Sequence, residues 1–302
     1  MQSGVRGGSF PLPERRSKID LHMHTTASDG ALTPAELVGE AKGQGLECIA
    51  VTDHDSTDGI EEAVAEGERL GVHVIPGIEM STDIPRAEVH ILGYYLRYHD
   101  AEFQTTLQQL REGRRDRAEK MVAKLAGMGV IIPWERVQEV AGQGSVGRPH
   151  IAQVMVETGY VSSMVEAFTD YIGRNAPAYV ERYKLTPVEA VGLIRKVQGL
   201  PVLAHPGEVL TLDTLLPELI SAGLVGLECY YGDYSPETVE GLLALADEHG
   251  LVPTGGTDFH RIEGFGHGPH HPGDTWVPWE SVRRLKALAV HLQGERRVDT
   301  AR

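Results

Sequence analysis

The sequence has little cysteine and no long hydrophobic run. Its 302 residues include two cysteines, Cys48 and Cys229, each inside an apolar stretch. We interpret both as small buried hydrophobic residues, which excludes a disulfide framework and favours a reducing compartment. No stretch approaches the roughly 20 apolar residues of a membrane span, and the N-terminus lacks an apolar run of signal-peptide length. We therefore expect a cytoplasmic protein with no membrane partner.

Basic residues are scarce. The chain has 28 Lys and Arg residues against 43 Asp and Glu residues, a formal net charge of −15. This balance argues against a broad basic surface for nucleic acid, so an anionic substrate would need local positive charge. The overall composition, 41% hydrophobic and 24% charged, is typical of a soluble globular protein.

Short apolar runs of strand length recur along the chain. They span residues 18–24, 46–54, 72–79, 89–96, 201–206, 225–231 and 251–260. Helix starts lie between many of them, at Thr33, Thr186 and Ser235, each followed by proline. Nearly continuous apolar strands separated by amphipathic helices predict a parallel sheet covered on its outer side. The fold class is therefore α/β, either a barrel or a doubly wound sheet.

The strand pattern stops between residues 100 and 180, where helical patterns follow one another. We predict an all-helical insertion between the fourth and fifth strands, acting as a lid over the substrate. The alternative is a packing or dimerisation subdomain. The predicted domains are a flexible tail (1–17), a catalytic barrel (18–99 and 181–302) and the insertion (100–180).

Imidazoles and carboxylates lie at or near the carboxyl ends of the predicted strands, where α/β folds build their sites. In a strand, residues i and i+2 point the same way, so His22 and His24 can enter one cavity, as can Asp258 and His260. The full set is His22, His24, Asp53, His54, Glu79, His90, His205, Asp258 and His260.

So many converging imidazoles and carboxylates would repel one another or remain without partners unless cations held them. Histidine and carboxylate ligands without cysteine suit Zn²⁺, Mn²⁺ or Fe²⁺. The donors exceed what one ion needs, which predicts two or three ions with at least one bridging carboxylate. Asp53 is either a ligand or a residue that orients His54 by accepting its second ring N–H.

The ordered motifs DLHMHT with SDG, VTDHDS, PGIE, VHILGY, AHP and GTDFH resemble those of the PHP (polymerase and histidinol phosphatase) family, from about residue 18 to about 290. The resemblance implies a distorted (β/α)7 barrel and three metal positions. These would be held by His22, His24, Glu79 and Asp258, by Glu79, His90 and His205, and by His54, His260 and a further ligand. Some family members have a histidine where this chain has SDG, so Asp29 is the expected substitute.

Within the family, the helical insertion and the stretch GRPHIA resemble stand-alone phosphoesterases that act on nucleotides. Some of these remove the 3′-phosphate of 3′,5′-bisphosphonucleotides, and others trim short RNA from its 5′ end. The polymerase-associated and histidinol phosphatase branches fit less well. The expected partner is thus a small phosphorylated substrate, a nucleotide or short RNA.

Two arginines are candidate substrate contacts. Arg148 opens a helix, where free backbone N–H groups and a guanidinium can hold a phosphate, although it can equally be a simple helix-start residue. Arg117 is the foremost residue of a basic helix face made by Arg111, Arg114, Arg115, Arg117, Lys120 and Lys124, a pattern that is also common on solvated helices. The loop 265–274 carries His267, His270 and His271, which form either a lid over the substrate or an exposed turn.

The predicted activity is hydrolysis of a nucleotide phosphate ester by a metal-bridging hydroxide, with His205 or Asp53 protonating the leaving alkoxide. One alternative is a phosphatase of another small metabolite such as histidinol phosphate. Another is an amidohydrolase-type hydrolase, since similar clusters in barrels also cleave carbon-based esters and amides. A third is an idle metal- or nucleotide-binding module.

Overall fold

The computed structural model describes residues 17–299 except 85–86, 143, 182–183, 233 and 261–270. The strands of this part form one sheet in sequence order. They are β1 (Ile19–Asp20), β2 (Cys48–Val51), β3 (His73–Ile84), β4 (Ala87–Tyr94), β5 (Leu200–Leu203), β6 (Gly226–Tyr231) and β7 (Val252–Gly256). The Leu21 N–H donates to the Gly255 carbonyl, and Met23 pairs with Phe259, so the last strand meets the first and the sheet is a nearly closed barrel.

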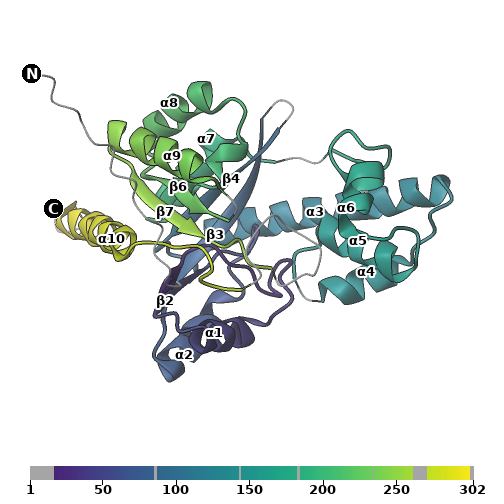
Figure 1. Ribbon diagram of the computed structural model, residues 1–302, viewed down its shortest axis with the longest axis horizontal. Helices are drawn as coiled ribbons and strands as arrows, with labels where there is room; N and C mark the ends of the chain where they lie inside the picture. Colours follow the sequence, from purple (N-terminus) through teal and green to yellow (C-terminus); the bar gives the residue numbers. More distant parts are fainter. Residues whose placement is uncertain are drawn as a thin grey trace, which may run out of the picture.

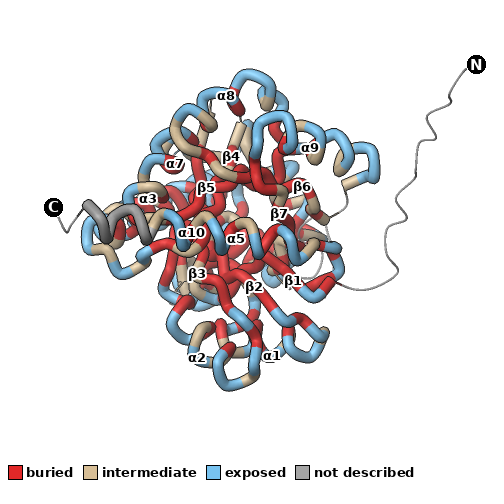
Figure 2. The backbone as a smooth tube through the Cα atoms, turned by 90° about the vertical axis from the view of Figure 1, so that its left-hand side faces the viewer, coloured by how far each residue is buried: buried red, intermediate tan, exposed pale blue. Residues whose placement is uncertain are grey.

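Helices cover the outside of this barrel (Figure 1). They are α1 (Pro34–Gly43), α2 (Ile60–Leu70), α7 (Pro187–Lys196), α8 (Leu212–Ala222), α9 (Pro236–Glu248) and α10 (Trp279–Asp299), with a short 3-10 turn η2 (Pro206–Glu208) after β5. The strands are buried and the helices expose their outer faces (Figure 2). Both cysteines are fully buried, as predicted. No helix in the described part of the chain is long and apolar enough to span a membrane.

The predicted helix starts are confirmed. At α1, the Thr33 hydroxyl accepts from the Glu36 N–H at 3.3 Å, and the Glu36 carboxylate accepts from the Thr33 N–H at 2.9 Å. The same reciprocal cap opens α7 at Thr186 and Glu189. These caps satisfy N–H groups that the helix itself leaves without partners.

Strand β4 departs from the expected parallel order. It pairs antiparallel with β3 on one side and β5 on the other. Only residues 85–86 separate β3 from β4, too few for the crossover that parallel strands need. His90 is therefore not at the carboxyl end of its strand. It lies inside β4 opposite Ser81, and the reversed direction of β4 places it beside Glu79.

The all-helical insertion lies between β4 and β5, as predicted, and projects away from the barrel (Figure 1). Its elements are α3 (Ala101–Gly127), α4 (Trp134–Ala141), α5 (Arg148–Glu157), α6 (Met164–Ala167) and a π-helical turn η1 (Phe168–Ile172). It has its own hydrophobic core, which includes Met121, Leu125, Ile151 and Met155. The distal part of the insertion therefore packs around itself rather than onto the sheet.

Candidate metal centre

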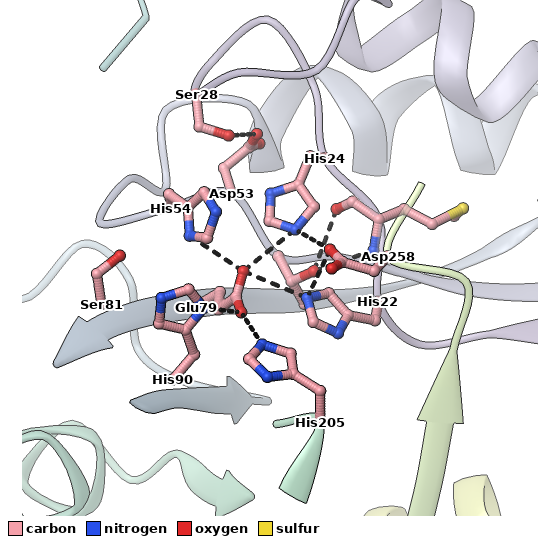
Figure 3. A network of polar contacts seen from close by, with 12 residues as sticks. His22, His24, Ser28, Asp53, His54, Glu79, Ser81, His90, His205 and Asp258 are labelled. Atoms are coloured by element: carbon pink, nitrogen blue, oxygen red, sulfur yellow. Dashed lines mark hydrogen bonds and ion pairs between the residues drawn. The ribbon is translucent and has the colours of Figure 1, made fainter. Parts of the chain in front are cut away.

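Glu79 is the central carboxylate of a buried cluster at one end of the barrel (Figure 3). It projects from β3 and is 1% exposed. Five imidazoles surround its two oxygens at 2.8–3.3 Å, from His22, His24, His54, His90 and His205. These histidines come from four separate segments of the chain, so the barrel rather than any one motif assembles the cluster.

The donor atoms fall into three groups that can each hold a cation. They are His22, His24, Glu79 and Asp258; His24, Asp29, His54 and His260; and His54, Glu79 and His90. The first group has the composition that the family resemblance implies for one metal. The second contains Asp29 with His54 and His260, as expected for another. In the third, His54 stands where the resemblance implies His205, although His205 Nε2 also lies 3.3 Å from Glu79 Oε1.

The residues present fit divalent cations, because many of their buried polar atoms lack hydrogen bonds. Among the described residues, these atoms include His22 Nε2, both ring nitrogens of His24, Asp29 Oδ1, His54 Nδ1, Glu79 Oε2 and Asp258 Oδ1. Leaving a buried polar group without a partner costs about 1–3 kcal/mol. These atoms without hydrogen bonds come from several segments and face one another, as the ligands of a metal ion do.

Burial and the neighbouring charges shift the pKa values of the cluster residues in opposite directions. Burial lowers the pKa of His24, but Asp258 and Glu79 outweigh it and raise that pKa to about 10. At His54 burial dominates and lowers the pKa to about 3 despite two nearby carboxylates. Burial raises the pKa of Glu79, but the surrounding imidazoles hold it well below its usual range. Neutral imidazoles and ionised carboxylates, the forms that bind metal, become compatible when cations lie between them.

Backbone geometry brings the first and last motifs together. At Gly256, at the end of β7, a Cβ atom would lie 2.4 Å from the His22 backbone nitrogen, so only glycine permits this approach. Asp258 follows in the left-handed region at φ 52°. It lies beyond β7, so the i, i+2 argument for a strand does not describe its pairing with His260. Asp258 Oδ1 lies 3.0 Å from His24 Nε2, whereas His260 Nε2 lies 3.4 Å from Asp29 Oδ1.

Asp53 holds a turn rather than the His54 ring. Its Oδ1 accepts from the Thr25 N–H at 2.8 Å and the Ser28 hydroxyl at 2.6 Å, and its Oδ2 accepts from the Thr25 hydroxyl at 2.7 Å. Both oxygens are thus engaged, and the Thr25–Ser28 turn that they hold leads directly to Asp29. This geometry favours a positioning role for Asp53, and its catalytic role stays a prediction.

Glu228 is a residue of the site that the sequence analysis missed. It is fully buried in β6, where Oε1 lies 3.0 Å from His22 Nδ1 and Oε2 accepts from the His205 N–H at 2.7 Å. A carboxylate on the second nitrogen of a metal-binding histidine fixes the tautomer and orientation of its ring. The available signal was a single acidic residue inside the apolar run VGLECYY.

The insertion reaches the barrel through charged pairs that the sequence did not predict. Arg114, on α3 and 6% exposed, donates from Nε to Asp55 Oδ2 at 2.8 Å. Asp55 directly follows His54, and its Oδ1 accepts from the Ser81 N–H at 2.9 Å. Arg114 therefore connects the insertion to the chain segment that carries a candidate ligand.

A second group of charges lies where β3 and β4 extend toward the insertion. Arg148 donates to Glu88 Oε2 at 2.8 Å, and Lys184 donates to Glu88 Oε1 at 2.6 Å. Arg174 binds Asp83 through two hydrogen bonds of 2.8 Å. Glu88 precedes His90 by two residues in β4, so Arg148 and Lys184 bind a strand that carries a candidate metal ligand. The substrate role of Arg148 stays a prediction.

The remaining residues that the sequence singles out beside the substrate are Arg117 and the histidines of loop 265–274. Arg117 is 4% exposed in α3, so it is not part of a solvated basic face, and its substrate role stays a prediction. His267 and His270 lie outside the described residues. His271 is half exposed, with Nδ1 3.8 Å from Glu40 Oε1 of α1.

Comparisons with known proteins show the family and the fold of the chain. Residues 20–136 match the PHP domain model. The chain is 34% identical over 249 residues to the 3′,5′-nucleoside bisphosphate phosphatase of Chromobacterium violaceum, covering 81% of this chain and 87% of that protein. It is 36% identical over 248 residues to the 5′-3′ exoribonuclease Rnm of Escherichia coli, covering 80% and 85%.

A solved structure, described as an amidohydrolase from C. violaceum with bound sulfate and no metal, has the same fold. It superposes with a TM-score of 0.80 at 33% identity, covering 90% of this chain and 97% of that one. Sequence similarity and fold thus extend together over most of the chain, including the insertion. The chain belongs to the PHP family.

Proposed function

We propose that this chain is a metal-dependent phosphoesterase that hydrolyses a phosphate ester of a nucleotide. The substrates that fit best are the 3′-phosphate of 3′,5′-bisphosphonucleotides and short 5′-phosphorylated RNA. The observation that carries the proposal is the cluster around Glu79, in which donors from several segments converge and many of their buried atoms lack hydrogen bonds. The relatives named as a nucleotide phosphatase and an exoribonuclease support the choice of substrate.

The donor set would hold two or three divalent cations, of Zn²⁺, Mn²⁺ or Fe²⁺ type, because it contains imidazoles and carboxylates without cysteine. Bound there, such cations neutralise phosphoryl oxygens and lower the pKa of water. Imidazoles lie against both oxygens of Glu79, so this carboxylate would be the one to bridge two cations.

The chain's own residues orient the reacting groups. Glu228 holds His22 and the backbone of His205, and Asp53 holds the turn before Asp29. Burial lowers the pKa of His205, but Glu79 outweighs it and raises that pKa to about 9. His205 is 9% exposed, and where a metal does not fully engage its imidazole it can protonate the leaving alkoxide.

Arg148 supports a nucleotide substrate. Its guanidinium lies 5.5 Å from the Phe168 ring centroid and 5.9 Å from that of Tyr179, and its side chain remains 17% exposed. Lys184 binds the same carboxylate, Glu88, and also lies 3.7 Å from Asp83 Oδ1. The planar guanidinium of Arg148 is the group here that can accept a phosphate of the substrate that is not cleaved. A lid role for the insertion and a cytoplasmic location are part of the same proposal.

The test is phosphate release from adenosine 3′,5′-bisphosphate, AMP, a short 5′-phosphorylated RNA and histidinol phosphate, with Mn²⁺-loaded and chelated protein. Release of phosphate from the bisphosphate, or of nucleotides from the RNA, that disappears with chelator would support the proposal. Activity on histidinol phosphate alone would overturn the substrate class. Turnover of an aryl acetate without any phosphate ester would favour the amidohydrolase alternative, and inactivity on all of them would overturn the enzymatic function.

A further inference from the structure

The insertion carries an open groove outside the metal cluster. Its volume is about 770 Å³, and its lining residues are Lys120, Ala123, Lys124, Tyr179, Val180 and Glu181. Lys120 and Lys124 are four residues apart on α3, so both ammonium groups lie on the same face of this helix. The opposite wall is the segment that returns from the insertion to the barrel.

This wall is held in place by the insertion itself. Lys124 Nζ donates to the Tyr179 carbonyl at 2.7 Å. The Ala178 N–H donates to the Tyr171 carbonyl at 2.8 Å, and the Ala178 side chain is buried in the insertion core. The Tyr179 ring is therefore presented at a fixed position beside the two lysines.

A series of side-chain contacts links the groove to the strand that carries His90. Tyr179 lines the groove, and the Arg148 guanidinium lies over the Tyr179 ring, 5.9 Å from the ring centroid. Arg148 bonds to Glu88, and Glu88 and His90 are two residues apart on the same face of β4, roughly 7 Å along the strand. A strand of nucleic acid leaving the cluster would thus meet Arg148, then Tyr179 and then the lysines.

The charge and ring content of the groove match such a strand. Two lysines line it in a chain with a net charge of −15. Its single carboxylate, Glu181, accepts from the Tyr179 hydroxyl at 3.3 Å and lies 3.6 Å from a nitrogen of Arg174, the guanidinium that binds Asp83. The two lysines therefore outnumber the one carboxylate that lines the groove. Lysines beside an aromatic ring are the elements that bind single-stranded nucleic acid, through phosphate contacts and base stacking.

We propose that this groove binds the nucleotides that follow the one held at the metal cluster, so that the site is built for short single-stranded oligonucleotides. The inference rests on the proposed function for the position of the terminal nucleotide. A mononucleotide held at the cluster would extend to Arg148 without using the lysines. The cluster alone fits both a 3′,5′-bisphosphonucleotide and a short RNA. Only the RNA would contact the lysines of the groove, so the groove distinguishes the two substrates.

The test compares Lys120→Gln/Lys124→Gln with a matched control, Lys42→Gln/Lys196→Gln, which removes the same charge from exposed positions on α1 and α7. For a 5′-phosphorylated RNA hexamer, the groove variant should raise KM roughly tenfold, while kcat/KM for adenosine 3′,5′-bisphosphate stays within about twofold. The slope of log affinity against log salt should fall by roughly 1.4, for two phosphate contacts to a single strand. Tyr179→Leu should also weaken hexamer binding.

Equal effects on both substrates, or equal behaviour of the groove and control variants, would overturn the proposal. Hexamer binding is also measured by fluorescence anisotropy with the Glu79→Gln protein, which needs no turnover. Weaker hexamer binding by the groove variant would support the role of the groove even if the protein hydrolyses no phosphate ester. The absence of hydrolysis would then contradict the proposed function alone. Unchanged anisotropy affinity would overturn the groove whatever the activity.

Discussion

The metal cluster and the insertion are built in different ways. The cluster consists of buried side chains from many segments, held within 2.8–3.3 Å of one carboxylate by the barrel. The insertion has its own distal core, and the first half of α3 joins the barrel core through Phe103, Leu107 and Leu110. Charged pairs, among them Arg114 with Asp55 and Arg148 with Glu88, connect the insertion to the segments beside the cluster. The barrel thus fixes the donor atoms of the cluster, whereas a separate core and a few buried charged pairs fix the insertion.

The largest effect is expected inside the cluster. Glu79→Gln removes the carboxylate that five imidazoles share, so turnover should fall by at least about 10³-fold, because several kcal/mol of charge stabilisation depend on bound cations. Metal content per chain, measured by plasma emission, should fall with it. The exposed Glu47→Gln is the control. A Glu79→Gln protein with full metal content and full activity would remove the bridging role.

The junction between the two regions is tested by Arg114→Met. This change leaves the fully buried Asp55 carboxylate without its cation, so the free energy of unfolding should fall by about 3–5 kcal/mol. Denaturant titration measures it. Arg115→Met, on the same helix but 58% exposed and paired with Glu119, should change stability by less than about 1 kcal/mol. Similar losses in both variants would show that the buried pair has no special role.

Glu228→Gln tests whether the barrel orients the ligands. The substitution keeps the shape of the side chain but weakens the contacts with His22 and the His205 N–H, so metal affinity should fall by about 10–100-fold. Competition with a coloured chelator measures the affinity, and near-UV circular dichroism checks that the fold is kept. An unchanged affinity would make Glu228 a purely structural residue.

The smallest effect is expected at the substrate side. Arg148→Gln removes a charged hydrogen-bond donor, so KM for a nucleotide substrate should rise roughly tenfold with little change in kcat. Arg136→Gln, an exposed arginine on α4 of the same insertion, is the matched control. If kcat falls while KM stays constant, Arg148 acts on the chemistry rather than on binding.

The sequence predicts the cluster well because each motif places donors next to a strand, and strand ends of a barrel converge. It also predicts the caps of α1 and α7, because the two residues that form each cap are three positions apart in the sequence. It does not predict the antiparallel β4, because the run at 89–96 looks the same in either direction. It also misses Glu228. The partners of Arg114 and Arg148 are missed because pairs such as Arg114 and Asp55, 59 residues apart, depend on how the insertion folds back.

The most direct test of the account is anomalous X-ray diffraction from crystals grown with Mn²⁺. The account predicts two or three anomalous peaks around Glu79, one of them among His22, His24, Glu79 and Asp258. Peaks elsewhere on the surface, with none inside the cluster at saturating Mn²⁺, would contradict the central claim that these residues are metal ligands.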